Sequence, residues 1–261
     1  MFTVSQKKFK GYRTVAVVTP PKPKAQGGGK KVPKNKFILM RIDQDASPQK
    51  DLEWKDEIIL EKGESLSYSP NFGIEREIIL ACGPSGSGKS YFLGKYVKEY
   101  TQKKKVNDYL VISLVPKDSA LDRYDPERPM LDDLPDIKEI PDSLVVFDDT
   151  ESIPDKKLLA SVNALRDQIL TIGRHNNISC LLTQHNIQNG HKSRTLLNET
   201  HGIVIYPRAG GTYQIRQYLK TYIGLSKKKI DRILSLPSRA VLVYKQYPNF
   251  VLHDKGVYSL S

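Results

Sequence analysis

The chain has 261 residues, of which 39% are hydrophobic, so it is long enough to bury one substantial α/β core, and its formal net charge is +12. The start has no continuous apolar stretch and no run of 18 apolar residues occurs, so we expect neither a secreted protein nor a membrane-spanning one. Cys82 and Cys180 both lie in apolar runs, which predicts reduced core thiols in a reducing compartment rather than a disulfide.

The positive charge is concentrated at the N-terminus. Residues 1–42 contain eleven Lys and Arg and no acid, whereas residues 43–261 carry 30 basic and 29 acidic residues. The same segment contains VTPPKPKAQGGGKKVP at 18–33, which is too poor in apolar residues to pack a core. We therefore expect residues 1–36 to form a disordered basic arm, which either contacts nucleic-acid phosphates or serves as a solubilising or targeting tail.

Two short apolar runs follow the arm. Phe37–Ile42 and Ile58–Leu60 have the length and composition of strands and are joined by an acidic, irregular connection. We expect residues 37–74 to form a small sheet that precedes a main domain at 75–261.

The main domain opens with a glycine-rich phosphate-binding motif. The apolar run Ile78–Cys82 predicts a strand and residues 91–98 have helical spacing of apolar side chains, so the segment between them joins a strand to a helix. Such a P-loop directs backbone N–H groups and a helix N-terminus at phosphates, with the lysine on the β- and γ-phosphates and the hydroxyl on Mg²⁺. The residues predicted to bind the phosphates of ATP are Gly83, Pro84, Ser85, Gly86, Ser87, Gly88, Lys89 and Ser90.

A second motif lies at the end of an apolar strand. Residues 109–115 predict one strand, residues 117–142 predict loops because prolines are scattered among acids, and Leu144–Phe147 predicts the next strand. This strand ends in Asp148 and Asp149, which places both carboxylates at the sheet edge where α/β proteins bind ligands. We predict that Asp148 holds Mg²⁺ together with Ser90 and that Asp149 is the general base that activates water.

The third motif is a glutamine at the end of the following strand. Residues 154–173 have helical spacing, and the apolar run 178–182 that follows ends in Thr183-Gln184. Strands that alternate with helices predict a parallel sheet, so Gln184 should lie beside the Asp148-Asp149 edge if the two strands are neighbours. There it could contact both water and γ-phosphate and sense the phosphate state.

The order of these motifs resembles a known superfamily. A P-loop, a strand ending in Asp-Asp, the pair Gly173-Arg174 and then ISCLLTQ resemble the FtsK–HerA superfamily of DNA-pumping ATPases. GRHNNIS, TQHN and the tail SRAVLVYKQYPNFVLHDKGVYSL resemble the genome-packaging ATPases of large double-stranded DNA viruses, the poxvirus-type branch. The likeness covers residues 75–261. Bacterial members usually have Asp-Glu at Asp148-Asp149, and their interval from Gly173 to Gln184 is one residue longer.

This resemblance implies a RecA-like, mainly parallel sheet flanked by helices, with a C-terminal β-hairpin. It also implies an Mg²⁺-dependent ATPase that forms a pentameric or hexameric homo-oligomeric ring around double-stranded DNA, acts with capsid proteins, and works in the host cytoplasm and virion. Arg174 would then be an arginine finger given to the neighbouring subunit. Its alternative role is to cap the end of the preceding helix.

Two other classes of protein share some of these motifs. A small-molecule kinase has a P-loop, but it usually needs an arginine-rich lid, and residues 117–142 contain only Arg123 and Arg128. A non-motor virion or DNA-binding protein could use the P-loop as a nucleotide switch, although such a protein has no use for a water-activating carboxylate. The run Lys227–Lys229 is a further candidate for DNA contact or simply the solvated face of a helix at 226–236.

Overall fold

A computed structural model describes residues 1–21, 34–41, 52–106, 108–187 and 193–260. The chain folds around a nine-stranded sheet in the order β4-β13-β12-β11-β10-β6-β9-β8-β7. Five strands are parallel: β6 (Ile78–Cys82), β7 (Tyr109–Ser113), β8 (Leu144–Asp148), β9 (Ser179–Gln184) and β10 (Gly202–Ile205). Four are antiparallel to their neighbours: β4 (Glu57–Ile59), β11 (Val241–Tyr244), β12 (Phe250–His253) and β13 (Gly256–Ser259). The predicted α/β fold and C-terminal hairpin are confirmed.

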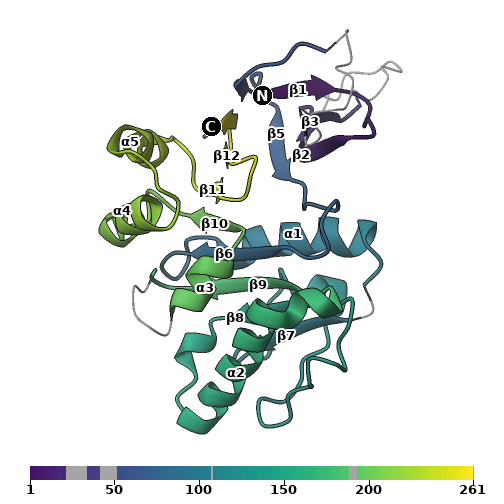
Figure 1. Cartoon of the computed structure of the whole chain (residues 1–261), viewed down its shortest axis with the longest axis vertical. Helices are drawn as coiled ribbons and strands as arrows, with labels where there is room; N and C mark the ends of the chain where they lie inside the picture. The colour runs from purple at the N-terminus through teal and green to yellow at the C-terminus, as the bar shows by residue number, and fades with distance from the viewer. Residues whose placement is uncertain (22–33, 42–51, 107, 188–192, 261) are drawn as a thin grey trace, which may run out of the picture.

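The order of the parallel strands decides which motifs meet. β9 lies between β6, which leads into the P-loop, and β8, which ends in the two aspartates (Figure 1). The condition that we set for Gln184, that its strand neighbours the Asp148 strand, is therefore met. Because parallel strands all end at one edge, the ends of β6, β9 and β8 bring the three motifs together.

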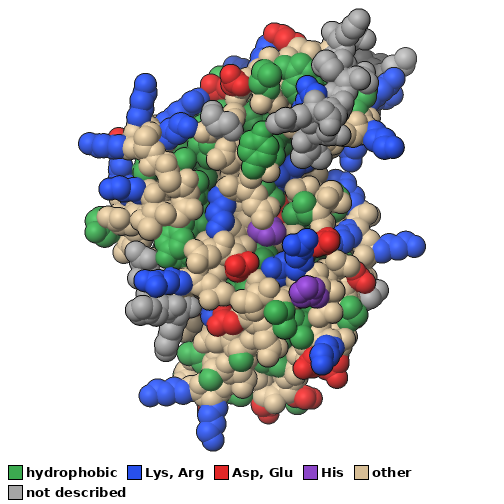
Figure 2. Space-filling model, viewed as in Figure 1, with side chains coloured by type: hydrophobic (Ala, Val, Ile, Leu, Met, Phe, Trp, Pro, Cys, Tyr) green, Lys and Arg blue, Asp and Glu red, His purple; other side chains and the backbone are tan. Residues whose placement is uncertain are grey.

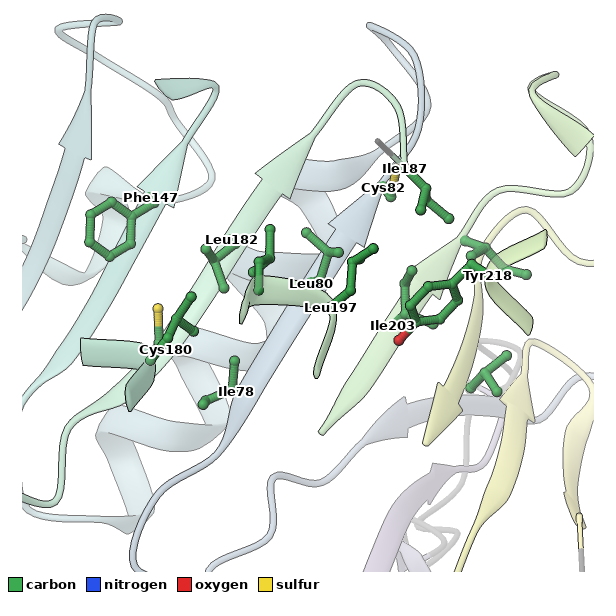
Figure 3. Packing of buried hydrophobic residues seen from close by; sticks show 14 of the residues in the cluster. Ile78, Leu80, Cys82, Phe147, Cys180, Leu182, Ile187, Leu197, Ile203 and Tyr218 are labelled. Carbon is green, nitrogen blue, oxygen red and sulfur yellow. The ribbon is translucent and has the colours of Figure 1, made fainter. Parts of the chain in front are cut away.

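Each face of the sheet is covered by a different set of elements. Helices α2 (Lys156–Ile172), α3 (Arg194–Glu199), α4 (Thr212–Thr221) and α5 (Lys227–Ser235) contribute to the core on one face. There side chains such as Leu80, Leu182 and Ile203 point from neighbouring strands toward Leu197 of α3 and Tyr218 of α4 (Figure 3). Helix α1 (Lys89–Lys103) packs on the other face, together with a second, smaller sheet.

Two helices begin directly after a residue whose side chain caps the helix N-terminus. α2 begins after Asp155, whose carboxylate accepts hydrogen bonds from the main-chain N–H groups of Lys157 and Leu158, and α5 begins after Ser226, whose hydroxyl accepts from Lys229 N. The short helices η1 (Asp122–Tyr124), η2 (Thr150–Ser152) and η3 (Gly173–Asn176) are single turns of 3₁₀ helix. Residues 117–142 otherwise consist of loops, as their prolines predict.

The small sheet corrects the expectation of a disordered arm. Its order is β1 (Phe2–Ser5), β3 (Lys36–Arg41), β2 (Tyr12–Thr19) and β5 (Ser65–Tyr68), and all pairs are antiparallel. The prediction for residues 1–36 is therefore wrong for 2–5 and 12–19, while 22–33 lie outside the described residues. The apolar runs Phe37–Ile42 and Ile58–Leu60, which we expected in one small sheet, belong to different sheets. The first contributes β3 to the small sheet, and the second contributes to β4 of the large sheet.

A buried ionic network fixes the small sheet to the large one. Arg13 of β2 is 5% exposed and donates from Nη2 to the hydroxyl of Tyr68 (2.8 Å), and its guanidinium lies 3.6 Å from Glu77 Oε1. Glu77, which precedes β6, also accepts from the hydroxyls of Tyr68 (2.6 Å) and of Tyr96 in α1 (2.7 Å). Arg13 was counted in the sequence as part of a basic arm. In the fold it is a core residue whose charge is paired, as burial requires.

Cys82 and Cys180 are both free and buried, which confirms the prediction of core thiols. Burial raises the pKa of each thiol to about 12. Neither sulfur is therefore a reactive thiolate at neutral pH. Within the described ranges, no helix is both long and apolar enough to cross a bilayer.

A half-buried histidine just before β10 predicts a loss of stability in acid. His201 Nδ1 accepts a hydrogen bond from Ile78 N (3.3 Å), and burial, followed by the charges of Arg76 and Lys245, lowers its pKa from 6.5 to about 4. The unfolded chain therefore binds this proton more readily than the folded one. We expect stability to be lost as pH falls from about 6.5 to about 4, by on the order of 3 kcal/mol.

The measurement is urea unfolding of the wild type and His201→Asn across this pH range. Asparagine can keep the acceptor for Ile78 N without titrating, so its profile should be flatter than that of the wild type. His175→Asn, at an exposed histidine, is the matched control and should keep the wild-type slope. If the free energy of unfolding depended on pH equally in all three proteins, His201 would not be the cause of the loss of stability in acid.

Candidate active site

The P-loop joins β6 to α1 in a conformation that requires glycine at several positions. Gly86 and Gly88 have φ of 72° and 110°, in the left-handed region. A Cβ on Gly83 would lie 2.6 Å from Cδ2 of Tyr206, so only glycine allows this approach. The loop therefore closes tightly before Lys89 begins the helix, which is the geometry that presents backbone N–H groups to phosphates.

Lys89 lies inside the loop and faces the carboxylates. Its ammonium donates to the carbonyl oxygen of Gly83 (3.0 Å) and lies 3.7 Å from Oδ1 of Asp149, and the side chain is only 6% exposed. A main-chain carbonyl group of the loop therefore holds the lysine side chain in place, and the carboxylate of Asp149 lies beside it. Ser90, the predicted Mg²⁺ ligand, is the next residue of the helix.

Thr183 connects the two aspartates. Its hydroxyl lies 3.0 Å from Oδ1 of Asp148 and 3.2 Å from Oδ1 of Asp149, and it accepts a hydrogen bond from Asp149 N (2.7 Å). Asp149 has φ of 46°, a left-handed value for a residue other than glycine. This backbone turn directs the carboxylate of Asp149 back toward Lys89 rather than along the strand.

The two carboxylates have different environments. Burial raises the pKa of Asp148, and the Thr183 hydroxyl acts in the opposite direction. Asp149 is more accessible, with about a third of its side chain exposed. Asp148 therefore fits a place beside a bound cation, whose positive charge would stabilise the carboxylate that burial deprives of water. Asp149 is open to solvent water.

Gln184 is tied directly to the P-loop. Its main-chain carbonyl accepts a hydrogen bond from Gly83 N (3.0 Å), and its side-chain Oε1 is buried without a hydrogen-bond partner among the described residues. The Ser87 hydroxyl of the loop is likewise buried and unpartnered within the described structure. Unsatisfied polar atoms at the site fit a polar ligand such as a triphosphate with Mg²⁺, whose oxygen ligands would come from Ser90 and Asp148.

His185 and Glu151 also lie at the site, although the motif analysis gave them no role. His185 Nε2 is 3.5 Å from Oδ1 of Asp149, and its main-chain N donates to Oε2 of Glu151 (3.4 Å). Burial raises the pKa of Glu151. His185 belongs to the TQHN stretch that carries the family resemblance, and that position was the available signal.

Arg239 supports the P-loop from the other side. It precedes β11 and donates from Nε to the carbonyl of Ser87 (2.9 Å) and from Nη2 to that of Gly86 (2.8 Å). Its own main-chain N donates to Oδ2 of Asp254 (3.0 Å). The residue begins the RAVLVYK part of the tail resemblance, which by itself suggested no contact with the loop.

Arg174 is the one predicted site residue that the fold places elsewhere. It lies in η3, before β9 begins, whereas Gln184 lies at the far end of β9, a strand that is itself about 17 Å long. Its Nε donates to Oε2 of Glu75 (2.7 Å), and 71% of the side chain is exposed. Arg174 therefore cannot reach the P-loop of its own chain.

Comparison with known proteins shows that the chain is similar in sequence to a virophage protein. The chain is 37% identical over 212 residues to uncharacterized protein V3 of the Sputnik virophage. The aligned region covers 79% of this chain and 85% of V3. No protein-family profile matches the chain.

Among solved structures, the fold is similar to that of the genome packaging NTPase B204 from Sulfolobus turreted icosahedral virus 2 in complex with sulfate. The TM-score is 0.51 at 13% identity, over 69% of this chain and 96% of B204. The pCW3 conjugation coupling protein TcpA gives a TM-score of 0.48 at 13% identity, over 87% of this chain and 75% of TcpA.

The similarity to B204 concerns the fold, while the identity to V3 is high enough to establish common descent. The motif order, the strand order and the matches to V3 and B204 agree with one another. The chain belongs to the family of the Sputnik virophage protein V3, and its fold is similar to that of the packaging NTPase B204.

Proposed function

We propose that the protein is an ATP-driven motor that packages double-stranded viral DNA into a capsid. The observation that carries the proposal is the meeting of Lys89, Asp149 and Gln184 at the P-loop edge, with Asp149 3.7 Å from the lysine. A site that only binds nucleotide needs the loop and the lysine, but it does not need an accessible carboxylate. The virophage origin of V3 and the similarity of the fold to that of B204, a genome packaging NTPase, support this use of the site.

Each residue has a part in this proposal. The backbone of residues 83–90 binds the phosphates of ATP, and Lys89 contacts the β- and γ-phosphates. Ser90 and Asp148 would hold Mg²⁺, which when bound neutralises charge on the phosphates. Asp149 orients the attacking water and accepts its proton, and Gln184 reports the presence of the γ-phosphate to the loop through Gly83.

The position of Arg174 supports action across a subunit boundary. An exposed arginine at the edge opposite the P-loop can complete the site of a neighbour in a closed ring, of five or six subunits by the family resemblance. Transition-state charge would then be stabilised only when two subunits are correctly joined. Nucleotide hydrolysis and subunit movement are coupled in such an arrangement.

The DNA contacts of a motor should be with phosphates, because a motor must move along any sequence. Lys and Arg side chains gather around α5, where Lys227 and Lys228 are exposed, whereas Lys229 donates to the carbonyl of Leu260 (Figure 2). The basic lysines at 22–31 are further candidates and lie outside the described residues. We propose that the motor works in the host cytoplasm and virion and docks on capsid protein.

The kinase alternative gains no support from the fold. Arg128, one of two arginines in the segment where a lid would lie, donates from Nε to Asp122 (3.0 Å) and from Nη1 to the carbonyl of Val115 (3.1 Å). These bonds hold the segment together within the chain. Arg128 therefore has a structural role rather than that of a free phosphate ligand.

The test is steady-state ATP hydrolysis by the purified protein at fixed low salt. It is measured without nucleic acid, with single-stranded DNA and with long duplex DNA. We expect duplex DNA to stimulate turnover several-fold, and Lys89→Ala to abolish turnover because the phosphates lose their main cationic contact. Arg123→Ala is the matched control, which removes an exposed positive charge away from the loop. Hydrolysis that is indifferent to every DNA would contradict the motor, and turnover unchanged in Lys89→Ala would contradict the site.

A further inference from the structure

Two cationic side chains hold the main-chain carbonyl groups of the P-loop. Lys89, which belongs to the loop motif, donates to the carbonyl oxygen of Gly83 (3.0 Å). Arg239, which precedes β11, donates from Nη2 to the carbonyl oxygen of Gly86 (2.8 Å) and from Nε to that of Ser87 (2.9 Å). The arginine therefore ties the loop to a part of the chain that contains none of the three sequence motifs.

Arg239 acts on the part of the loop that has the most backbone freedom. Gly86 and Gly88 both have φ in the left-handed region, and glycine loses more conformational freedom on ordering than any other residue. The guanidinium lies so close to the loop that a Cβ on Gly88 would be 3.4 Å from Nε of Arg239. Arg239 thus restrains the residues whose ordering would otherwise reduce the affinity for a phosphate ligand.

The restraint also fixes the direction in which the loop presents its donors. In a trans peptide unit, the C=O and N–H bonds point in opposite directions. Because Arg239 holds the carbonyl oxygen of Ser87, the N–H group of Gly88 in the same peptide unit points away from the guanidinium. Main-chain N–H groups of such loops are the groups that bind phosphates. Arg239 therefore orients a phosphate-binding donor from the opposite side of the loop.

The C-terminal hairpin holds Arg239 in turn. Its main-chain N–H donates to Oδ2 of Asp254 (3.0 Å), which lies in the turn between β12 and β13. The main-chain N–H of Asp254 donates to Oγ of Ser238 (3.0 Å), and this buried hydroxyl donates to the carbonyl oxygen of Ala240 (2.7 Å). These bonds fix the residues on both sides of Arg239 to the hairpin turn, so the place of the guanidinium depends on the hairpin.

We propose that Arg239 is a positioning residue of the nucleotide site, which keeps residues 86–88 in the phosphate-binding conformation before ATP arrives. It acts through the main chain of the loop and not on the reacting phosphate. Asp254 and the β12–β13 turn keep Arg239 in place, so the C-terminal hairpin contributes to nucleotide affinity. This inference rests on the proposed function, because it presumes that the P-loop binds a triphosphate.

The first measurement is amide hydrogen exchange of residues 83–90 in the full-length protein without nucleotide. Arg239→Ala should speed exchange in this segment several-fold, because the loop loses its restraint. Arg208→Ala is the matched control, since it removes an exposed arginine that follows β10, and it should leave exchange at the wild-type rate. Unchanged exchange in Arg239→Ala would overturn the inference.

The second measurement combines calorimetric titration with Mg²⁺-ATP and steady-state hydrolysis. Bound phosphates order the loop themselves, so Arg239→Ala should raise Kd and KM about tenfold and change kcat by less than about threefold. Arg239→Lys keeps the charge but not the planar pair of donors, and its affinity should be intermediate. Equal weakening by Arg208→Ala would assign the effect to net charge, and a loss of kcat at unchanged Kd would place Arg239 in the reaction itself. Either result would overturn the inference.

Variants of Asp254 test the contribution of the hairpin. Asp254→Asn keeps an oxygen acceptor for the main-chain N–H of Arg239, whereas Asp254→Ala removes it. Only the alanine variant should weaken ATP binding, by about fivefold, as the loss of one hydrogen bond does. Thermal unfolding confirms that both variants are folded, and equal affinities would contradict the role of the hairpin.

The same titrations separate this inference from the proposed function. If the wild type bound no Mg²⁺-ATP, the proposed function would fail and the inference with it. If the wild type bound Mg²⁺-ATP and Arg239→Ala bound it equally well, only the positioning role of Arg239 would be wrong.

Discussion

Arg174→Ala should lower DNA-stimulated ATP turnover by about 10³-fold or more, the range known for arginine fingers. The reason is positional, since Arg174 lies at the edge of the sheet opposite its own P-loop and 71% of its side chain is exposed. Within its own chain, Arg174 Nε forms an ion pair with Oε2 of Glu75 at 2.7 Å. Only a neighbouring subunit could bring this guanidinium to a triphosphate. The measurement is steady-state hydrolysis at fixed salt with long duplex DNA.

Mixing variants distinguishes action in trans from a local role. Arg174→Ala keeps an intact P-loop and Lys89→Ala keeps Arg174, so under the proposed action in trans, mixtures of the two variants should recover part of the activity that each lacks alone. Glu75→Gln is the matched control, because it breaks the ion pair and keeps the arginine. If Glu75→Gln reproduced the loss and mixing restored nothing, the role of Arg174 would be structural, at the end of α2.

Asp149→Asn should bind ATP with near-normal affinity and hydrolyse it about 10²- to 10⁴-fold more slowly. The amide has almost the size of the carboxylate, so it can keep the contact with Thr183, but it cannot accept a proton from water. Lys89 remains in place because it is also held by the carbonyl of Gly83. Calorimetric binding and single-turnover hydrolysis, measured on the same preparation, separate the two effects.

Glu151→Gln is the informative companion variant. Glu151 is half-buried, burial raises its pKa, and it contacts His185, which in turn lies 3.5 Å from Asp149. If Asp149 is the general base, Glu151→Gln should retain most of the single-turnover rate. Near-normal hydrolysis by Asp149→Asn together with a large loss in Glu151→Gln would assign the base role to Glu151 instead.

Much of the site could be predicted because its signals are local. The strand, loop and helix around Lys89 follow from glycine spacing and apolar runs, which act within a few residues. The same holds for Asp148 at the end of β8 and Gln184 at the end of β9. The position of a residue at the end of a parallel strand already determines the sheet edge at which it lies.

The contribution of Arg239 could not be predicted in this way. It lies more than 150 residues after the loop that it supports, and the contact exists only because β11 pairs antiparallel with β10 beside β6. His185 is likewise brought to Asp149 and Glu151 by the pairing of β8 with β9 rather than by spacing. Long-range pairings of this kind leave no periodic trace in a single sequence.

The N-terminal segment shows the limit of composition as a guide. The basic and Pro/Gly-rich stretch at 18–33 dominated the average over residues 1–36 and concealed the short alternating strand Tyr12–Thr19. The charge of Arg13 suggested exposure, yet its pairing with Glu77 and Tyr68 makes it part of the core. A buried charge is stable only with its partners, and those partners are distant in the sequence.

The sequence by itself therefore determined the P-loop, the carboxylate edge and the class of fold, because local hydrogen bonding and side-chain periodicity determine them. The tertiary structure alone decided that β9 lies between β6 and β8, that Arg174 faces away from its own site, and that the small sheet borders the loop. These relations depend on which strands pair and which faces are buried together. Their free energy comes from contacts between residues that are far apart in the chain.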